Sequence, residues 1–113
     1  LETSGIKRLK TVWKSTIIAI VVLAVFAVLV AEIWLWAFWY ALIGALPDLY
    51  TAAYFSTVSF TTVGYGDIVL GEHHRLFGAI EAANGFLMFG WATAFIFEII
   101  SKIYQKEGHA LEK

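Results

Sequence analysis

The 113-residue sequence contains no cysteine, a single proline and little charge. The absence of cysteine excludes disulfide bonds and thiolate metal sites. Charged residues make up only 15% of the chain, whereas an ordinary soluble domain has about 25%. The formal net charge of −1 gives no reason to expect a nucleic-acid partner. The sequence also lacks a nucleophile–base pair and a phosphate-binding loop that opens a helix, so we predict that the protein is not an enzyme.

Apolar residues dominate instead, at 60% of the chain, and 17% of all residues are aromatic. A chain of this size cannot hide so much apolar surface in its own core, because a small domain leaves much of its surface exposed to solvent. The natural solvent for such a surface is membrane lipid. We therefore expect a multi-pass membrane protein.

Two long apolar segments are separated by a loop region. The first, at about 15–45, carries Glu32 as its one charge, and the second lies at about 75–105. A helix needs roughly 20 residues to cross a bilayer, so both segments are long enough to span it. We expect them to form an outer and an inner transmembrane helix.

The region between the two spans holds a third, shorter helix. Gly44 to Pro47 interrupts the first span, and proline followed by Asp48 is typical of a helix start. The helix expected at about 48–60 is too short to cross a bilayer. It is therefore predicted to be re-entrant or interfacial.

Both ends of the chain are more polar than the spans. Residues 1–14 are basic, with apolar residues at near-helical spacing, which fits either a short interfacial helix or a frayed basic terminus. The tail at 106–113 ends in Leu-Glu-Lys, which resembles a cloning remnant. Basic residues precede the first span and follow the second, so we expect both termini in the cytoplasm of a cell whose plasma membrane holds the protein.

The segment between the short helix and the second span has a distinctive sequence, TTVGYGD at 61–67. A potassium ion that crosses lipid must exchange its water shell for protein oxygens, which backbone carbonyls can supply if they all point one way. Alternating left- and right-handed backbone conformations give this arrangement, and glycine adopts the left-handed one without a Cβ clash. Gly64 and Gly66 occupy alternate positions, as this geometry requires.

The complete TTVGYGD string follows YFSTVSF at 54–60 and lies between two spans. In this setting the chain, over about 15–105, resembles the two-transmembrane tetrameric potassium channel family, whose filter contains TVGYG. The resemblance implies an all-α fold with two transmembrane helices, a re-entrant pore helix and a filter loop, assembled as a C4 homotetramer. It also implies passive conduction of K⁺ through the pore. The K⁺-coordinating residues would be Thr62, Val63, Gly64, Tyr65 and Gly66.

The resemblance also assigns residues that support the filter. Tyr54 and Phe55 match the aromatic pair that packs behind it, and Asp67 matches the acid just outside it. Some family members have a glutamate in the pore helix where this chain has Val58. We therefore expect Asp67 to bond the Tyr54 hydroxyl instead, the alternative being a solvated residue at the pore mouth.

Glu32 and Glu81 lie within the two spans, where an ionisable group is costly unless it has a partner. Two positions are open for Glu81. It could line the pore and attract cations, or it could support the filter from behind, bonded to pore-helix hydroxyls or backbone in its ionised or its protonated form. Glu32 could meet Glu81 or a tryptophan N–H.

The inner helix also carries candidate gating residues. Gly85 matches the family's hinge glycine, although glycine in membrane helices often serves close packing, as we expect of Gly78 and Gly90. A stripe at helical spacing suits either helix packing or a hydrophobic gate at the cavity. Its residues are Phe86, Phe89, Thr93 and Phe97.

Other functions remain open at the sequence level. A weakly selective monovalent cation channel would share the same architecture, as would a non-conducting or transporter-type membrane subunit. The intact filter string favours potassium selectivity over these. Neither span carries regularly spaced arginines, so a voltage sensor is not predicted.

Overall fold

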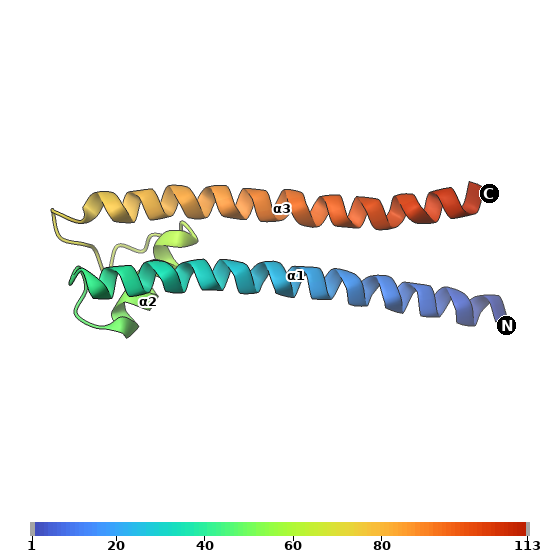
Figure 1. The fold of residues 1–113 in the computed structure, drawn as a ribbon, viewed down its shortest axis with the longest axis horizontal. Helices are drawn as coiled ribbons and strands as arrows, with labels where there is room; N and C mark the ends of the chain where they lie inside the picture. The colour runs from blue at the N-terminus through green and yellow to red at the C-terminus, as the bar shows by residue number, and fades with distance from the viewer. Residues whose placement is uncertain (1, 113) are drawn as a thin grey trace. The chain divides into compact units, whose positions relative to one another are not determined.

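The chain folds into three helices joined by two loops (Figure 1). The structure, a computed structural model, describes the backbone of residues 2–112 and the side chains of residues 4–106. Helix α1 runs over Glu2–Leu42, α2 over Leu49–Phe60 and α3 over Arg75–Glu112. All regular secondary structure in this described part is helical, so the fold class is all-α.

Two of these helices are long and apolar enough to cross a membrane. The candidate spans are Ser4–Leu42 in α1 and Arg75–Lys106 in α3. Each exceeds the roughly 20 residues that a bilayer requires. Helix α2, with 12 residues, is too short to do so.

Helix α1 continues without a break through the basic N-terminal segment. Residues 1–14 were expected to form a segment separate from the first span, but residues 2–14 belong to the same helix as the span. The Thr11 hydroxyl donates to the Lys7 carbonyl and the Thr16 hydroxyl to the Val12 carbonyl, at 2.9 and 2.7 Å. The change to polar composition near residue 14 therefore does not end the helix. At the other end of the chain, α3 likewise continues into the tail, whose side chains from 107 onward lie outside the described residues.

Gly44 determines where α1 ends. The glycine has a left-handed φ of 72°. Its amide donates to the Ala41 carbonyl at 3.3 Å, and the Ala45 amide donates to the Tyr40 carbonyl at 3.0 Å. These two bonds form a Schellman motif, which satisfies the last carbonyls of a helix. The outer helix consequently stops at Leu42, a little before the expected position near 45.

Asp48 caps the start of α2. Its backbone is extended, with φ −147° and ψ 168°, and its Oδ1 accepts a hydrogen bond from the Thr51 amide at 2.6 Å. This bond holds the pKa of the Asp48 carboxyl below its ordinary value. The aspartate thus satisfies one of the free amides at the helix start, as an N-cap residue should.

The chain divides into two compact units. Residues 27–91 form one, and residues 1–26 with 92–113 form the other. In the unit of residues 1–26 and 92–113, the Lys14 ammonium lies 5.2 Å from the centre of the Tyr104 ring, and Lys102 pairs with Glu98 at 3.4 Å. The unit of residues 27–91 contains all of α2 and the segment 61–67, so it holds the candidate site.

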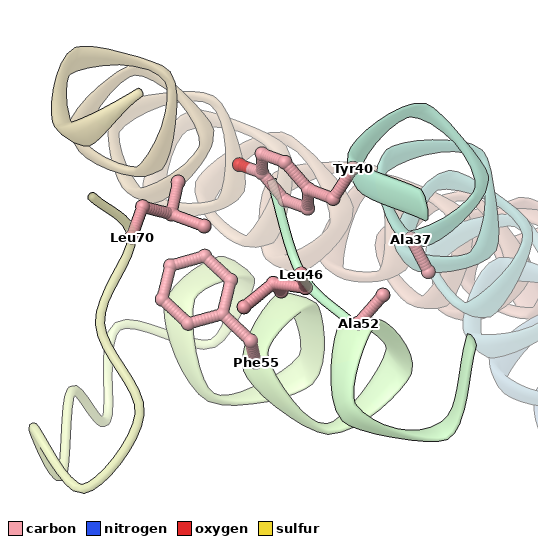
Figure 2. Close-up of a cluster of buried hydrophobic side chains, with 6 residues drawn as sticks. All are labelled: Ala37, Tyr40, Leu46, Ala52, Phe55 and Leu70. Atoms are coloured by element: carbon pink, nitrogen blue, oxygen red, sulfur yellow. The ribbon is translucent and has the colours of Figure 1, made fainter. Parts of the chain in front are cut away.

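A small apolar core fastens α2 to α1 within the 27–91 unit (Figure 2). The rings of Tyr40 and Phe55 meet edge to face, with centroids 5.5 Å apart. This arrangement is one that aromatic pairs favour. The cluster consists of Ala37, Tyr40, Leu46, Ala52, Phe55 and Leu70. Leu70 follows the candidate filter in the chain. The core therefore contacts both the short helix and the loop after the filter.

Candidate functional site

The candidate filter is tied to the last turn of α2 by its first backbone amides. The Val58 carbonyl accepts from the Val63 amide at 3.0 Å and from the Gly64 amide at 3.2 Å. The Thr62 amide donates to the Ser59 carbonyl, also at 3.0 Å. The carbonyls at a helix end have no partners within the helix, so these bonds both cap α2 and fix the start of the filter segment.

The backbone of the segment alternates in handedness. Thr62, Gly64 and Gly66 have φ angles of 63°, 58° and 78°, whereas Val63 and Tyr65 between them are not left-handed. The left-handed backbone of the two glycines was expected from the sequence, but that of Thr62 was not. Thr62 is the only non-glycine residue with positive φ in the described part of the chain. The alternation itself was the available signal, because it extends one step back from Gly64 to residue 62.

This alternation has a direct chemical meaning. An ordinary strand points successive carbonyls to opposite sides, and alternate left-handed residues turn them toward one side. A left-handed threonine costs about 1–2 kcal/mol relative to the right-handed form, and such strain persists only where the surroundings impose it. Segment 62–66 therefore has the backbone alternation that a row of cation-coordinating carbonyl oxygens requires.

Tyr54 and Asp67 connect the far end of the segment to α2. The Tyr54 hydroxyl donates to Asp67 Oδ2 at 2.7 Å, which is the hydrogen bond expected from the sequence. This bond, more than any other influence, raises the pKa of the Tyr54 hydroxyl. Together with the amides bound to Val58, it holds the segment to one helix at both of its ends.

Glu81 lies fully buried at the meeting point of the three helices. Its Oε1 accepts a hydrogen bond from the Tyr40 hydroxyl of α1 at 2.9 Å, and its Oε2 bonds the Ser56 hydroxyl of α2. Ser56 Oγ in turn lies 3.0 Å from the Ile33 carbonyl oxygen of α1. Of the two positions considered for Glu81, the structure shows the one bonded to a hydroxyl of the short helix, that of Ser56 in α2.

The partners of Glu81 were not identified from the sequence. Tyr40 stands in an aromatic run and Ser56 among other hydroxyl residues of α2, so neither is distinctive by type. A buried acid needs hydroxyl or amide partners. The expectation that Glu81 bonds α2 rested on this requirement alone. Glu32 is not part of this cluster: its Oε2 is buried and has no hydrogen-bond partner among the described residues.

At Gly85, α3 lies very close to the end of α2. A Cβ atom built on Gly85 would lie 1.8 Å from the Phe60 carbonyl oxygen and 2.6 Å from its carbonyl carbon. Gly78 is less crowded, with its nearest atom, Cζ of Phe55, at 3.2 Å. For Gly90 the expectation of close packing is not met among the described residues of the chain, because no atom beyond its chain neighbours and its own helix backbone lies within 4 Å of its Cβ position. Close approach at Gly85 is thus a packing feature that can exist with or without a hinge.

The stripe on α3 is divided between the two compact units. The Phe89 ring lies 5.8 Å from the Phe60 ring at the end of α2, and Phe86 is exposed. Thr93 and Phe97 belong to the other compact unit, where Phe97 is exposed. Their gating role stays a prediction.

Comparison with known proteins gives a family assignment. A family model described as an ion channel matches residues 15–102, which include α2 and the segment 61–67 as well as most of both spanning helices. A search of curated proteins and of solved structures found no significant match. The match covers most of the chain and agrees with two helices able to cross a membrane. The chain therefore belongs to the ion channel family of two-transmembrane type and is a membrane protein.

Proposed function

We propose that the protein is the pore-forming subunit of a potassium-selective channel that conducts K⁺ passively across the plasma membrane. The observation that carries this proposal is the left-handed backbone at residues 62, 64 and 66 within the sequence TVGYG. Backbone oxygens from this segment would replace the water shell of K⁺. Thr62, Val63, Gly64, Tyr65 and Gly66 would be the coordinating residues.

One chain supplies only one wall of an oxygen cage, so the proposal requires a ring of subunits. Four-loop filters imply a homotetramer with C4 symmetry. The exposed side chains of Val63 and Tyr65 support such a ring, because both are apolar or aromatic and have little cover within a single chain. Neighbouring copies would pack against them.

The remaining architecture follows from this arrangement. Helix α2 would be re-entrant, because irregular backbone at membrane depth is tolerated only where protein surrounds it or water fills a cavity. The carbonyl end of α2 would face the ion path, where its partial negative charge favours a cation. The basic residues outside the spans favour a cytoplasmic location for both termini. Gly85 and the α3 stripe would contribute to gating.

The test is electrical. Purified protein reconstituted in planar bilayers, with K⁺ on one side and Na⁺ on the other, should give currents that reverse close to the K⁺ equilibrium potential. Currents that reverse near zero would show a weakly selective cation channel instead. The absence of any current or flux would indicate a non-conducting or transporter-type subunit.

Tyr54→Phe tests how the filter is held at its outer end. The substitution removes the hydroxyl that donates to Asp67 and leaves the ring in place. We expect several-fold shorter conducting bursts in single-channel recordings, because the outer end of the filter loses its bond to α2. Ion selectivity should be retained while the channel is open.

The matched control is Tyr50→Phe. Tyr50 lies on the same helix and is 84% exposed, so loss of its hydroxyl should leave burst length unchanged. Equal burst lengths in Tyr54→Phe and the parent protein would show that the bond to Asp67 does not stabilise the conducting filter.

A further inference from the structure

We propose that Glu81 is protonated on Oε2 and donates a hydrogen bond to Ser56 Oγ. In this neutral form Glu81 is the positioning residue for α2, the helix that holds the filter. The protonation argument rests on the geometry of one buried cluster. Only the effect on the filter rests on the proposed channel function.

The argument begins with a count of hydrogen atoms at Ser56. A serine hydroxyl has a single hydrogen to donate. Its Oγ lies 3.0 Å from the Ile33 carbonyl oxygen, which can only accept. The Ser56 hydrogen is therefore needed for the bond to Ile33. The second contact of the same oxygen, with Glu81 Oε2, is a hydrogen bond only if the glutamate supplies the hydrogen.

The other carboxyl oxygen fits the same assignment. Glu81 Oε1 lies 2.9 Å from the Tyr40 hydroxyl, which donates to it. With the proton on Oε2, Oε1 is a carbonyl oxygen and a good acceptor. The bonds then run in one direction, from Tyr40 to Glu81 to Ser56 to Ile33. Every polar atom in this chain of hydrogen bonds has a partner of the right kind.

An ionised Glu81 fits less well. It would take the Ser56 hydrogen for itself, and the Ile33 carbonyl would face Ser56 Oγ at 3.0 Å without a hydrogen between them. The carboxylate would also be buried without a counter-charge. Tyr40 is the titratable group that bonds it, and no lysine, arginine or histidine among the described residues forms an ion pair with it. Burying an uncompensated charge is strongly unfavourable.

The location of the cluster explains why its protonation matters for the filter. Ser56 lies on α2 two residues before Val58, whose carbonyl binds the Val63 and Gly64 amides. The bonds of Ser56 to Ile33 and to Glu81 tie this part of α2 to both α1 and α3. Loss of the Glu81 proton would break one of these two hydrogen bonds, because the single Ser56 hydrogen could then bond only one of the two acceptors. The neutral carboxyl thus positions the carbonyl on which the filter begins.

Infrared spectroscopy of the purified protein in lipid vesicles tests the protonation directly, without any need for conduction. The carbonyl stretch of a protonated carboxyl group is well separated from the carboxylate bands. We expect the difference spectrum between the parent protein and Glu81→Gln to contain this stretch. Glu32→Gln is the matched control, and it should leave the Glu81 band in place.

Tyr40→Phe gives an independent spectroscopic readout. It removes the hydrogen bond accepted by the Glu81 carbonyl oxygen, so the stretch should move to higher frequency. A purely structural effect of the mutation would not produce this shift. Only carboxylate bands in the Glu81→Gln difference spectrum would overturn the protonation. A protonated-carboxyl band that does not shift in Tyr40→Phe would overturn the placement of the proton on Oε2, because Oε1 would then not be the carbonyl oxygen that Tyr40 bonds.

Flux of K⁺ into the same vesicles tests the positioning role. Glu81→Gln preserves a donor and an acceptor and should retain flux, whereas Glu81→Leu has a similar volume without hydrogen bonds and should lose most of it. Equal flux in Glu81→Leu and the parent would overturn the positioning role. A protonated-carboxyl band in a parent protein without any K⁺ flux would instead count against the channel function alone.

Discussion

Gly85→Ala is expected to prevent assembly of the folded protein. The added methyl carbon would lie 1.8 Å from the Phe60 carbonyl oxygen and within 3 Å of two further backbone atoms of the same residue. Backbone atoms cannot rotate out of the way, so α3 and the end of α2 would have to separate. Overpacking a well-packed core typically costs about 1–3 kcal/mol, and occasionally more. A clash with three backbone atoms belongs at or above the upper end of that range.

The measurement is size-exclusion chromatography of protein extracted in mild detergent, followed by K⁺ flux in vesicles. Gly85→Ala should give little material at the elution volume of the parent protein. Gly90→Ala is the matched control on the same helix, because its Cβ would meet no atom within 4 Å. It should assemble like the parent, helped slightly by the better helix propensity of alanine.

The same comparison separates packing from hinge motion at Gly85. If the glycine served only as a hinge, its alanine variant would assemble normally and differ in open probability. If it serves close packing, the loss appears already in assembly, before any gating is measured. A Gly85→Ala protein with parental assembly and parental flux would contradict the close approach of α3 to Phe60.

The helices followed from the sequence because their signals are local. The lengths of the apolar segments gave the two spans, and Pro47 with Asp48 gave the start of α2. The ends of α1 were harder to place. Composition changes at residue 14 without any helix-breaking residue, so α1 continues through it, and its other end depends on a two-bond motif centred on Gly44.

The contacts of the candidate site also differ in how far the sequence predicts them. Tyr54 and Asp67 flank one short segment, so their hydrogen bond could be expected from the sequence. The cluster around Glu81 joins residues from three helices, and its composition depends on how each helix is rotated about its axis. Apolar periodicity does not determine that rotation when all faces are apolar. The close contact of Gly85 with Phe60 was missed for the same reason.

Gly64→Ala should abolish selection of K⁺ over Na⁺. Gly64 has a φ of 58°, in the left-handed region where a Cβ atom clashes with the following carbonyl oxygen. The cost is about 1–2 kcal/mol for each alanine, and hence roughly 4–8 kcal/mol for four copies in a ring. A peptide flip that relieves this strain would turn a carbonyl away from the ion path. Bilayer recordings in mixed K⁺ and Na⁺ solutions should show the reversal potential moving toward zero.

Gly71→Ala is the control for this substitution. Gly71 follows the filter segment, is not left-handed and has no atom within 4 Å of its Cβ position. Its alanine variant should keep the reversal potential of the parent. A selective Gly64→Ala channel would show that carbonyl orientation at this residue does not determine selectivity.

The hydrogen bonds at the start of the segment explain why Gly64 should be less tolerant of alanine than an ordinary loop glycine. Its amide and that of Val63 both donate to the Val58 carbonyl, so the loop cannot shift to relieve the strain without breaking the bonds that cap α2. Thr62 is already held in the left-handed region two residues earlier. Alanine at position 64 would add a second strained side chain to the same short segment, and the backbone can relieve this strain only by changing its conformation. That change would remove the alternation of φ angles on which the row of carbonyl oxygens depends.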